Sequence, residues 1–158
     1  MANPLETGAP APGFRFARDD GSETTLADYA GRALVLYFYP KDDTSGCTRE
    51  AADFDALIPA FRDAGAEVLG VSPDPVRSHA NFKAKHGFAL ALGSDEAKDA
   101  CRAYGVWQEK SMYGRKYMGV ERTTFLIGPD GRLAEVWPKV SVKGHAEAVL
   151  AAVKALSR

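Results

Sequence analysis

Short apolar runs along the chain indicate buried strands. Residues 33–39 (ALVLYFY) are apolar on both faces, which is typical of a central strand in a sheet with both faces covered. Residues 67–72 predict a second buried strand, and residues 88–92 a third, shorter one. The first two are separated by a helical pattern, so together they predict a β-α-β unit with parallel strands.

Two further segments show the alternation and turn residues of hairpins. Residues 14–17 alternate apolar and polar positions before an Asp-Asp-Gly turn at 19–21, which predicts a short hairpin or an edge strand. Residues 123–127 and 133–137 flank a Gly-Pro-Asp-Gly turn, which predicts an antiparallel hairpin.

Apolar residues at spacings of three and four predict the helices. The first spans residues 45–64, and Pro59 inside it should kink or divide it, because proline removes a backbone donor. Further helices are predicted at 76–86, 95–104 and 144–156. Gly87 and Gly105 follow the first two of these helices directly. The polar segment 107–120 is interpreted as a loop. Strands that alternate with helices and end in a hairpin predict an α/β sandwich with a mixed sheet.

Length and charge narrow the class of protein. The 158 residues have room for one domain, 1–158. Twenty Lys and Arg balance 21 Asp and Glu, and a net charge of -1 supplies no overall field that attracts nucleic acid or anionic lipid. The longest apolar run, 33–39, is far shorter than the roughly 20 residues of a membrane helix. The first thirty residues contain no signal-peptide pattern, so we expect a cytoplasmic protein.

The cysteines and histidines do not form a metal-binding pattern. Cys47 and Cys101 are too few for a disulfide framework. The three histidines are scattered, and no C-x-x-C or H-x-x-x-H pair is present, so we expect no metal and no cofactor. Cys101 shares a helical face with Ala97 and Tyr104, which favours a buried structural thiol.

Cys47 lies where a reactive cysteine is expected. The loop that leaves the central strand opens directly onto a helix, which places Cys47 in its first turn. Unpaired N–H groups and the positive end of the helix dipole favour a thiolate there. Open α/β sheets also place their sites at the carboxyl ends of parallel strands. The alternative is a small hydrophobic residue packed under the helix start.

Spacing argues against several cysteine chemistries. A phosphatase of the C-x5-R type needs arginine six residues after the nucleophile, and Asp53 stands there. A dithiol oxidoreductase needs C-x-x-C, but Thr44 and Glu50 occupy the positions three residues away. A Cys-His hydrolase needs a base, and His145 is the only plausible one, with nothing in the sequence to place it near Cys47.

The same residues resemble a known family. Pro40, Thr44 and Cys47 stand in the P-x-x-x-T-x-x-C arrangement of the peroxiredoxins. The segments 39–42 (YPKD) and 46–50 (GCTRE) resemble the bacterioferritin-comigratory (PrxQ) branch, as do 112–114 and 119–125. The family's active-site arginine falls on Arg122. The resemblance covers nearly the whole chain and implies a thioredoxin-like α/β sandwich, with a central mixed β-sheet flanked by helices.

The resemblance implies a thiol-dependent peroxidase that reduces hydrogen peroxide and organic hydroperoxides. The Cys47 thiolate would attack one peroxide oxygen and become a sulfenic acid. Arg122 is suited to hold both the thiolate and the peroxide, and Glu50 could orient Arg122. Thr44 could orient the peroxide, and Pro40 could shield the sulfur from water. Without the resemblance, Pro40 would end a strand, Thr44 would cap the helix, and Glu50 would complement the helix dipole.

The chain departs from many members of this branch in its resolving cysteine. Ala52 stands at one position where relatives carry it, and Lys83 at the other. We therefore expect a one-cysteine mechanism with an external thiol as reductant, such as a thioredoxin, a glutaredoxin or a small thiol. In an alternative mechanism Cys101 resolves Cys47 after local unfolding.

A second class of function stays open, namely a non-catalytic thiol redox sensor or chaperone-like binding module on the same fold. The family's monomers favour a monomer, with a weak homodimer as the next choice. Basic and aromatic residues in 107–120 are expected to form a solvated loop beside the site, not a nucleic-acid surface; they are Lys110, Tyr113, Arg115, Lys116 and Tyr117.

Overall fold

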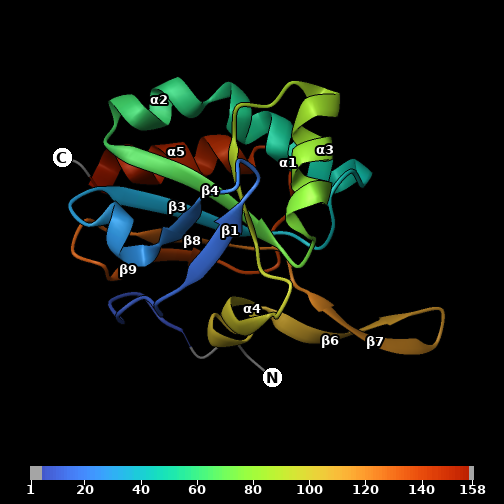
Figure 1. The fold of residues 1–158 in the computed structure, drawn as a ribbon. Helices are drawn as coiled ribbons and strands as arrows, with labels where there is room; N and C mark the ends of the chain where they lie inside the picture. The colour runs from blue at the N-terminus through green and yellow to red at the C-terminus, as the bar shows by residue number, and fades with distance from the viewer. Residues whose placement is uncertain (1–4, 157–158) are drawn as a thin grey trace.

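A seven-stranded mixed sheet forms the centre of the computed structural model, which describes residues 5–156 (Figure 1). The order of its strands is β2-β1-β5-β4-β3-β8-β9. The central strands β3, β4 and β5 are parallel, and the outer pairings are antiparallel. The strands are β1 (Arg15–Arg18), β2 (Glu23–Thr25), β3 (Ala33–Phe38), β4 (Ala66–Ser72), β5 (Ala91–Ser94), β8 (Thr123–Ile127) and β9 (Leu133–Trp137). The predicted α/β class, the mixed sheet and both hairpins are confirmed.

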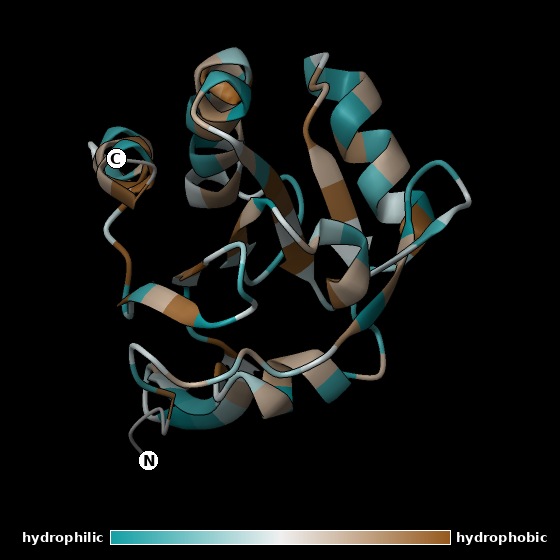
Figure 2. Cartoon of the chain, turned by 90° about the vertical axis from the view of Figure 1, so that its left-hand side faces the viewer, coloured by the Kyte–Doolittle hydropathy of each residue, from teal (hydrophilic) through white to brown (hydrophobic). Residues whose placement is uncertain are grey.

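The elements beside the sheet divide into two layers. One face carries α1 (Ser45–Ala56), α2 (Ile58–Asp63), α3 (Val76–His86) and α5 (His145–Leu156). The other face carries α4 (Asp99–Ala103) and the 3-10 helix Leu26–Tyr29. In Figure 2 the most hydrophobic segments are strands between these layers. No helix among residues 5–156 is long and apolar enough to cross a membrane.

The position of β3 between two hydrophobic cores explains why its sequence is apolar throughout. Val35 and Tyr37 pack into the cluster under α1 and α5, whereas Leu34, Leu36 and Phe38 pack into the cluster on the opposite face. All six residues of β3 are buried, since alternate side chains enter two separate cores.

The predicted helix 45–64 is divided, as its proline indicates. Helix α1 ends at Ala56, and α2 begins at Ile58 with Pro59 in its first turn. A proline is tolerated there because the first N–H groups of a helix have no acceptor inside the helix. This division turns the chain toward β4.

The predicted strand 88–92 is shifted in the structure, where β5 spans Ala91–Ser94. The N–H groups of Ala89 and Leu90 donate to Asp55 Oδ1 at 2.8 and 2.9 Å. These backbone donors are therefore tied to the end of α1 and cannot join the sheet. The apolar run predicted the strand too early in the chain, because Leu90 is buried although it lies before β5.

The predicted helix 95–104 is shorter in the structure, where α4 spans Asp99–Ala103. Asp95 lies before the helix, and its carboxylate accepts the N–H groups of Ala100 and Cys101 at 3.3 and 2.8 Å. Lys98 has φ 64°, in the left-handed region, which breaks any helical continuity from 95.

The prediction of a loop at 107–120 is wrong. Strands β6 (Trp107–Met112) and β7 (Arg115–Val120) form a two-stranded sheet that extends away from the main sheet (Figure 1). Its turn residues Tyr113 and Gly114 have φ values of 53° and 77°, the pattern of a two-residue type I′ hairpin turn. Most of its side chains are exposed on both faces, so the apolar alternation that identifies a half-buried strand is absent.

Candidate active site

Cys47 is the third residue of α1 and lies beyond the carboxyl end of β3. Its side chain is buried, with the residue 2% exposed. The first hydrogen bond of the helix runs from the Thr48 N–H to the Thr44 carbonyl, at 2.8 Å. Cys47 therefore occupies the first turn, where backbone N–H groups have no acceptor inside the helix.

Arg122 connects Cys47 with Glu50. It stands just before β8, and its Nη2 donates to Cys47 Sγ at 3.3 Å while its Nη1 donates to Glu50 Oε1 at 2.6 Å. Glu50 lies one helical turn after Cys47, so both acceptors project from the same side of α1. The planar guanidinium thus holds a buried carboxylate and a sulfur at once.

Burial dominates the electrostatics of this cluster. It raises the pKa of Glu50 to about 7, although the charge and hydrogen bond of Arg122 act in the opposite direction. Glu50 Oε2 is buried and has no hydrogen-bond partner among the described residues. Burial lowers the pKa of Arg122, but the charges of Glu50 and Cys47 outweigh it and hold that pKa above its ordinary value. The guanidinium therefore remains a cation beside the sulfur.

Gly46 is a site residue that the sequence did not single out. A Cβ built on Gly46 would lie 3.2 Å from Arg122 Nη2. That spacing is tighter than an ordinary van der Waals contact, so a Cβ at this position would push the guanidinium away by a few tenths of an ångström. Gly46 begins the segment 46–50 that resembles the PrxQ branch, but a glycine near a helix start is common whether or not a site lies there.

Thr44 and Pro40 lie in the loop between β3 and α1. Thr44 is the N-cap residue of α1, yet its hydroxyl makes no hydrogen bond to the helix and donates to the Lys41 carbonyl at 3.0 Å. The capping interpretation of Thr44 is therefore wrong for its side chain. Pro40 is half-buried and follows the last residue that bonds to β4, Tyr39, whose N–H donates to the Val71 carbonyl.

A polar network beside this loop was also missed from the sequence. Asp42, Asp74 and His79 bring ring nitrogen and carboxylate atoms within 4.8 Å of one another. His79 Nδ1 lies 2.7 Å from Asp42 Oδ2, and His79 Nε2 lies 2.9 Å from the Gly93 carbonyl. The ring nitrogens and the Asp42 carboxylate oxygens are all engaged in hydrogen bonds, so this cluster is a hydrogen-bond network.

His145 and Cys101 have surroundings unlike that of Cys47. His145 Nε2 lies 2.8 Å from the Thr124 hydroxyl, and burial together with the charge of Arg122 lowers the pKa of His145 to about 4. Cys101 is fully buried, and burial, with the nearby Asp95, raises its pKa well above the ordinary range. Cys101 packs in the cluster on the opposite face of the sheet from Cys47.

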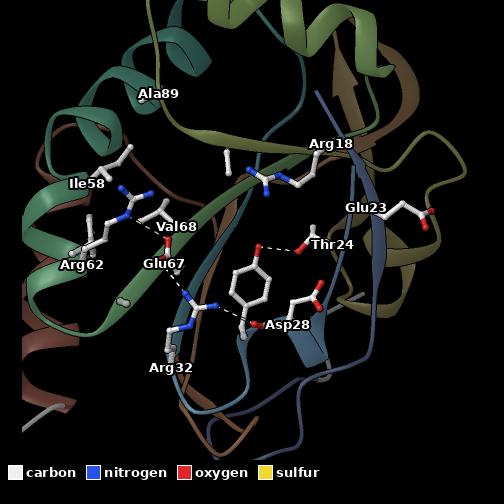
Figure 3. Close-up of a pocket in the computed structure, with 14 residues that line it drawn as sticks. Arg18, Glu23, Thr24, Asp28, Arg32, Ile58, Arg62, Glu67, Val68 and Ala89 are labelled. Atoms are coloured by element: carbon white, nitrogen blue, oxygen red, sulfur yellow. Dashed lines mark hydrogen bonds and ion pairs between the residues drawn. The ribbon is translucent and has the colours of Figure 1, made fainter. Parts of the chain in front are cut away.

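A cavity of about 390 Å³ lies elsewhere, near the amino-terminal end of β4 (Figure 3). Arg32 and Arg62 both contact Glu67 there, at 3.1 and 3.6 Å, and Arg18 extends into it. None of the residues proposed from the sequence lines this cavity. Arg32 and Arg62 share the single carboxylate of Glu67 there, whereas the loop before Cys47 lies beyond the opposite ends of the same strands.

Comparisons with known proteins agree with this geometry. Residues 7–136 match the AhpC/TSA family. Peroxiredoxin Bcp of Xanthomonas campestris is 57% identical over 135 residues, which cover 85% of this chain and 84% of that protein. Peroxiredoxin Bcp of Bacillus subtilis is 43% identical over 153 residues, 97% of this chain and 98% of that protein.

Solved structures give the same result. Peroxiredoxin Q of X. campestris superposes with a TM-score of 0.89 at 51% identity, covering 99% of both chains. A C47S mutant of PrxQ from Xylella fastidiosa superposes with a TM-score of 0.94 at 42% identity, covering 99% of this chain and 100% of that one. The chain therefore belongs to the AhpC/TSA family and, within it, to the Bcp (PrxQ) peroxiredoxins, which are thiol-dependent peroxidases.

Proposed function

We propose that this chain reduces hydrogen peroxide and organic hydroperoxides at Cys47. The thiolate sulfur attacks the terminal, hydrogen-bearing oxygen of the peroxide, the O–O bond to the leaving oxygen breaks, and an S–O bond forms. Cys47 is thereby oxidised to a sulfenic acid, and the peroxide is reduced to water or an alcohol once the leaving oxygen takes a proton. The contact of Arg122 Nη2 with Cys47 Sγ, at 3.3 Å, is the observation that best supports this function.

Arg122 supplies the fixed positive charge for this step. Negative charge moves from sulfur to the leaving oxygen, and preoriented donors along that line stabilise the transition state. Glu50 holds one side of the guanidinium at 2.6 Å, which leaves the other side for the sulfur and the peroxide. Glu50 is thus a positioning residue for Arg122.

Thr44 and Pro40 complete the proposed site. The Thr44 hydroxyl, at the N-cap of α1 and three residues before Cys47, would bind the peroxide. Pro40 offers no N–H and presents an apolar ring, which would limit access of water to the sulfur.

An external thiol completes the proposed cycle. It condenses with the sulfenic acid to form a mixed disulfide and water, and a second thiol then releases Cys47 and leaves as part of a disulfide. Ala52 cannot serve as an internal partner, and Lys83 pairs with Asp19 at 3.0 Å. Cys101 lies in the core on the opposite face of the sheet, which favours a one-cysteine mechanism.

The relatives support the choice of substrates. A bacterioferritin comigratory protein structure from X. campestris is described in terms of alkyl peroxide reduction, and it is 50% identical to this chain. We extend that substrate class to this protein, with a thioredoxin, glutaredoxin or small thiol as reductant and a cytoplasmic monomer as the working form.

Steady-state turnover tests this function. With excess peroxide and a thiol donor, the wild type is expected to consume many equivalents of peroxide per protein, whereas a redox sensor would consume about one. Cys47→Ser should abolish consumption, and Arg122→Ala should lower it by about 100-fold or more, the usual scale for a lost transition-state donor. Arg115→Ala, at an exposed residue of β7, is the matched control. Full turnover in Cys47→Ser would contradict the proposal.

A further inference from the structure

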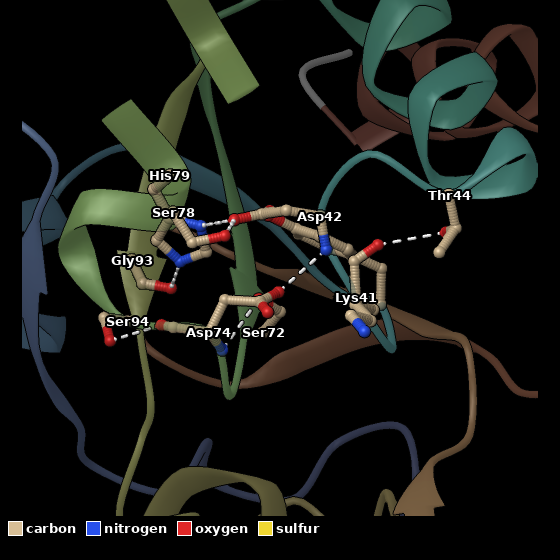
Figure 4. Close-up of polar contacts among 10 residues, drawn as sticks. Lys41, Asp42, Thr44, Ser72, Asp74, Ser78, His79, Gly93 and Ser94 are labelled. Atoms are coloured by element: carbon tan, nitrogen blue, oxygen red, sulfur yellow. Dashed lines mark hydrogen bonds and ion pairs between the residues drawn. The ribbon is translucent and has the colours of Figure 1, made fainter. Parts of the chain in front are cut away.

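One backbone peptide connects Thr44 with Asp74 (Figure 4). The N–H of Asp42 donates to Asp74 Oδ2 at 2.8 Å, and the carbonyl of the same peptide group, Lys41 O, accepts the Thr44 hydroxyl at 3.0 Å. A peptide group is planar, and its N–H and C=O point in opposite directions. The bond to Asp74 therefore fixes the direction in which the Lys41 carbonyl presents itself to Thr44.

The hydrogen bond from Thr44 to the Lys41 carbonyl determines which hydrogen-bonding group Thr44 offers to a ligand. A hydroxyl has one proton and two acceptor lone pairs. The Thr44 proton is committed to Lys41 O, and the hydroxyl makes no capping bond to α1. Its oxygen is thus left as an acceptor for a hydroxyl proton of a peroxide.

We infer that Asp74 is a positioning residue of the peroxidase reaction, which acts by holding the 41–42 peptide so that Thr44 accepts a hydrogen bond from the bound peroxide. This inference rests on the proposed function of Cys47 and Thr44. Asp74 does not touch the reacting atoms. It lies beyond the carboxyl end of β4, on a different segment from the catalytic loop.

Asp74 is itself held from two strands. The Ser72 hydroxyl donates to Asp74 Oδ2 at 2.6 Å, and the Ser94 hydroxyl donates to the Asp74 carbonyl at 2.6 Å. Ser72 ends β4 and Ser94 ends β5. The carboxylate is therefore anchored to the rigid sheet, as an effective positioning group requires.

The Asp42 side chain provides a second anchor for the same peptide. Its carboxylate accepts hydrogen bonds from Tyr39 and Ser78 at 2.5 and 2.7 Å and faces His79 Nδ1 at 2.7 Å. The Gly93 carbonyl can only accept, so His79 Nε2 carries a proton, and one further proton lies between Nδ1 and the carboxylate. Asp42 and His79 are buried, which makes this attachment rigid.

Two rates on the same cysteine test the inference. One is the single-turnover rate constant of Cys47 with hydrogen peroxide, and the other is its alkylation by iodoacetamide, which needs no peroxide positioning. Asp74→Ala should lower the peroxide rate about tenfold, the scale of a lost orientation effect, and leave alkylation within about twofold. Asp74→Asn, whose amide oxygen can still accept the Asp42 N–H, should restore most of the peroxide rate.

Asp43→Asn is the matched control. Asp43 lies on the same loop, and its two carboxylate oxygens are engaged by Lys85 and His86 at the surface. Both rates should remain within about twofold of wild type. If Asp74→Ala does not fold, Ser72→Ala removes the hydroxyl that holds Asp74 and should lower the peroxide rate about threefold.

A double-mutant cycle separates this inference from the proposed function. If Asp74 acts through Thr44, Asp74→Ala should cause no further loss in a Thr44→Val background. The inference alone would be overturned if Thr44→Val is slow but Asp74→Ala keeps the wild-type peroxide rate. It would also be overturned if Asp74→Ala lowers the peroxide rate by the same factor in the wild-type and the Thr44→Val backgrounds. A Thr44→Val variant that reacts like wild type would overturn the role of Thr44 and the inference with it.

Discussion

Arg122 packs against Gly46 so closely that a methyl group on the glycine would come within 3.2 Å of the guanidinium nitrogen that contacts the sulfur. The absence of a side chain at position 46 is thus part of the site. It allows an arginine from before β8 to approach the first turn of α1.

Gly46→Ala is therefore expected to weaken the reaction without weakening the fold. Alanine favours helix over glycine by up to about 1 kcal/mol, so the free energy of unfolding should stay equal or rise slightly. The single-turnover rate constant with peroxide should fall about tenfold because the guanidinium is displaced. Gly13→Ala is the matched control, since a Cβ there meets nothing within 4 Å. A Gly46→Ala variant with the wild-type rate would show that Arg122 tolerates the shift.

Glu50 should make stability fall as the pH rises. Burial raises its pKa from 4.5 to about 7 in the folded protein, so the native state binds more protons than the unfolded state in this range. The stabilisation from the protonated form is full below pH 4.5 and is lost as the pH rises through about 7. Relative to Glu50→Gln, wild type should lose on the order of 3 kcal/mol across this window, measured by urea unfolding.

Asp53 provides a check on that interpretation. Its charge raises the pKa of Glu50, so Asp53→Asn should move the window to lower pH. Parallel stability curves for wild type and Glu50→Gln would contradict the proposed buried carboxyl.

His145 should have the opposite effect on the pH dependence of stability, which should fall as the pH falls. Burial and the charge of Arg122 lower its pKa from 6.5 to about 4, so the unfolded state binds more protons between these values. The stability contributed by the neutral ring is full above pH 6.5 and is lost as the pH falls through about 4. His145→Gln keeps a hydrogen-bonding group near Thr124 and should remove most of this acid sensitivity, on the order of 3 kcal/mol. An unchanged slope would place the acid sensitivity elsewhere.

Cys101 is expected to be unnecessary for turnover. Cys101→Ala should keep the steady-state rate with an external thiol within about twofold and lower the free energy of unfolding by about 1 kcal/mol, because a small buried group is lost. Mass spectrometry of wild type without reductant, after one equivalent of peroxide, should show no bond between Cys47 and Cys101. Such a bond would require the two cores to open and would replace the one-cysteine mechanism.

The fold was largely predictable because its strands and helices have strong local signals. The strand β3 is apolar throughout, and Pro59 marks the division between α1 and α2. The errors fall where side chains far along the chain bind backbone groups, as Asp55 does at Leu90. The hairpin β6–β7 escaped prediction for another reason, since both its faces are exposed.

The candidate site was predictable only as far as a family pattern reached. Pro40, Thr44, Cys47 and Arg122 stand in that pattern, and the position of Glu50 one turn after Cys47 follows from helix geometry. Asp74 and His79 gave no signal, because their contacts with Asp42 span 32 and 37 residues and depend on how β4 and α3 pack. Local spacing cannot indicate contacts of this kind.

The placement of the two thiols in different layers of the molecule has a consequence when peroxide is abundant. Cys47 has no thiol beside it on its own face of the sheet within residues 5–156, so in the proposed one-cysteine mechanism the lifetime of its oxidised form would depend on how often a donor molecule arrives. During that interval a second peroxide competes for the same sulfur and converts it to a sulfinic acid, which thiols do not reverse. In that mechanism, the ratio of donor to peroxide around the protein would set how many cycles each copy completes before it is inactivated.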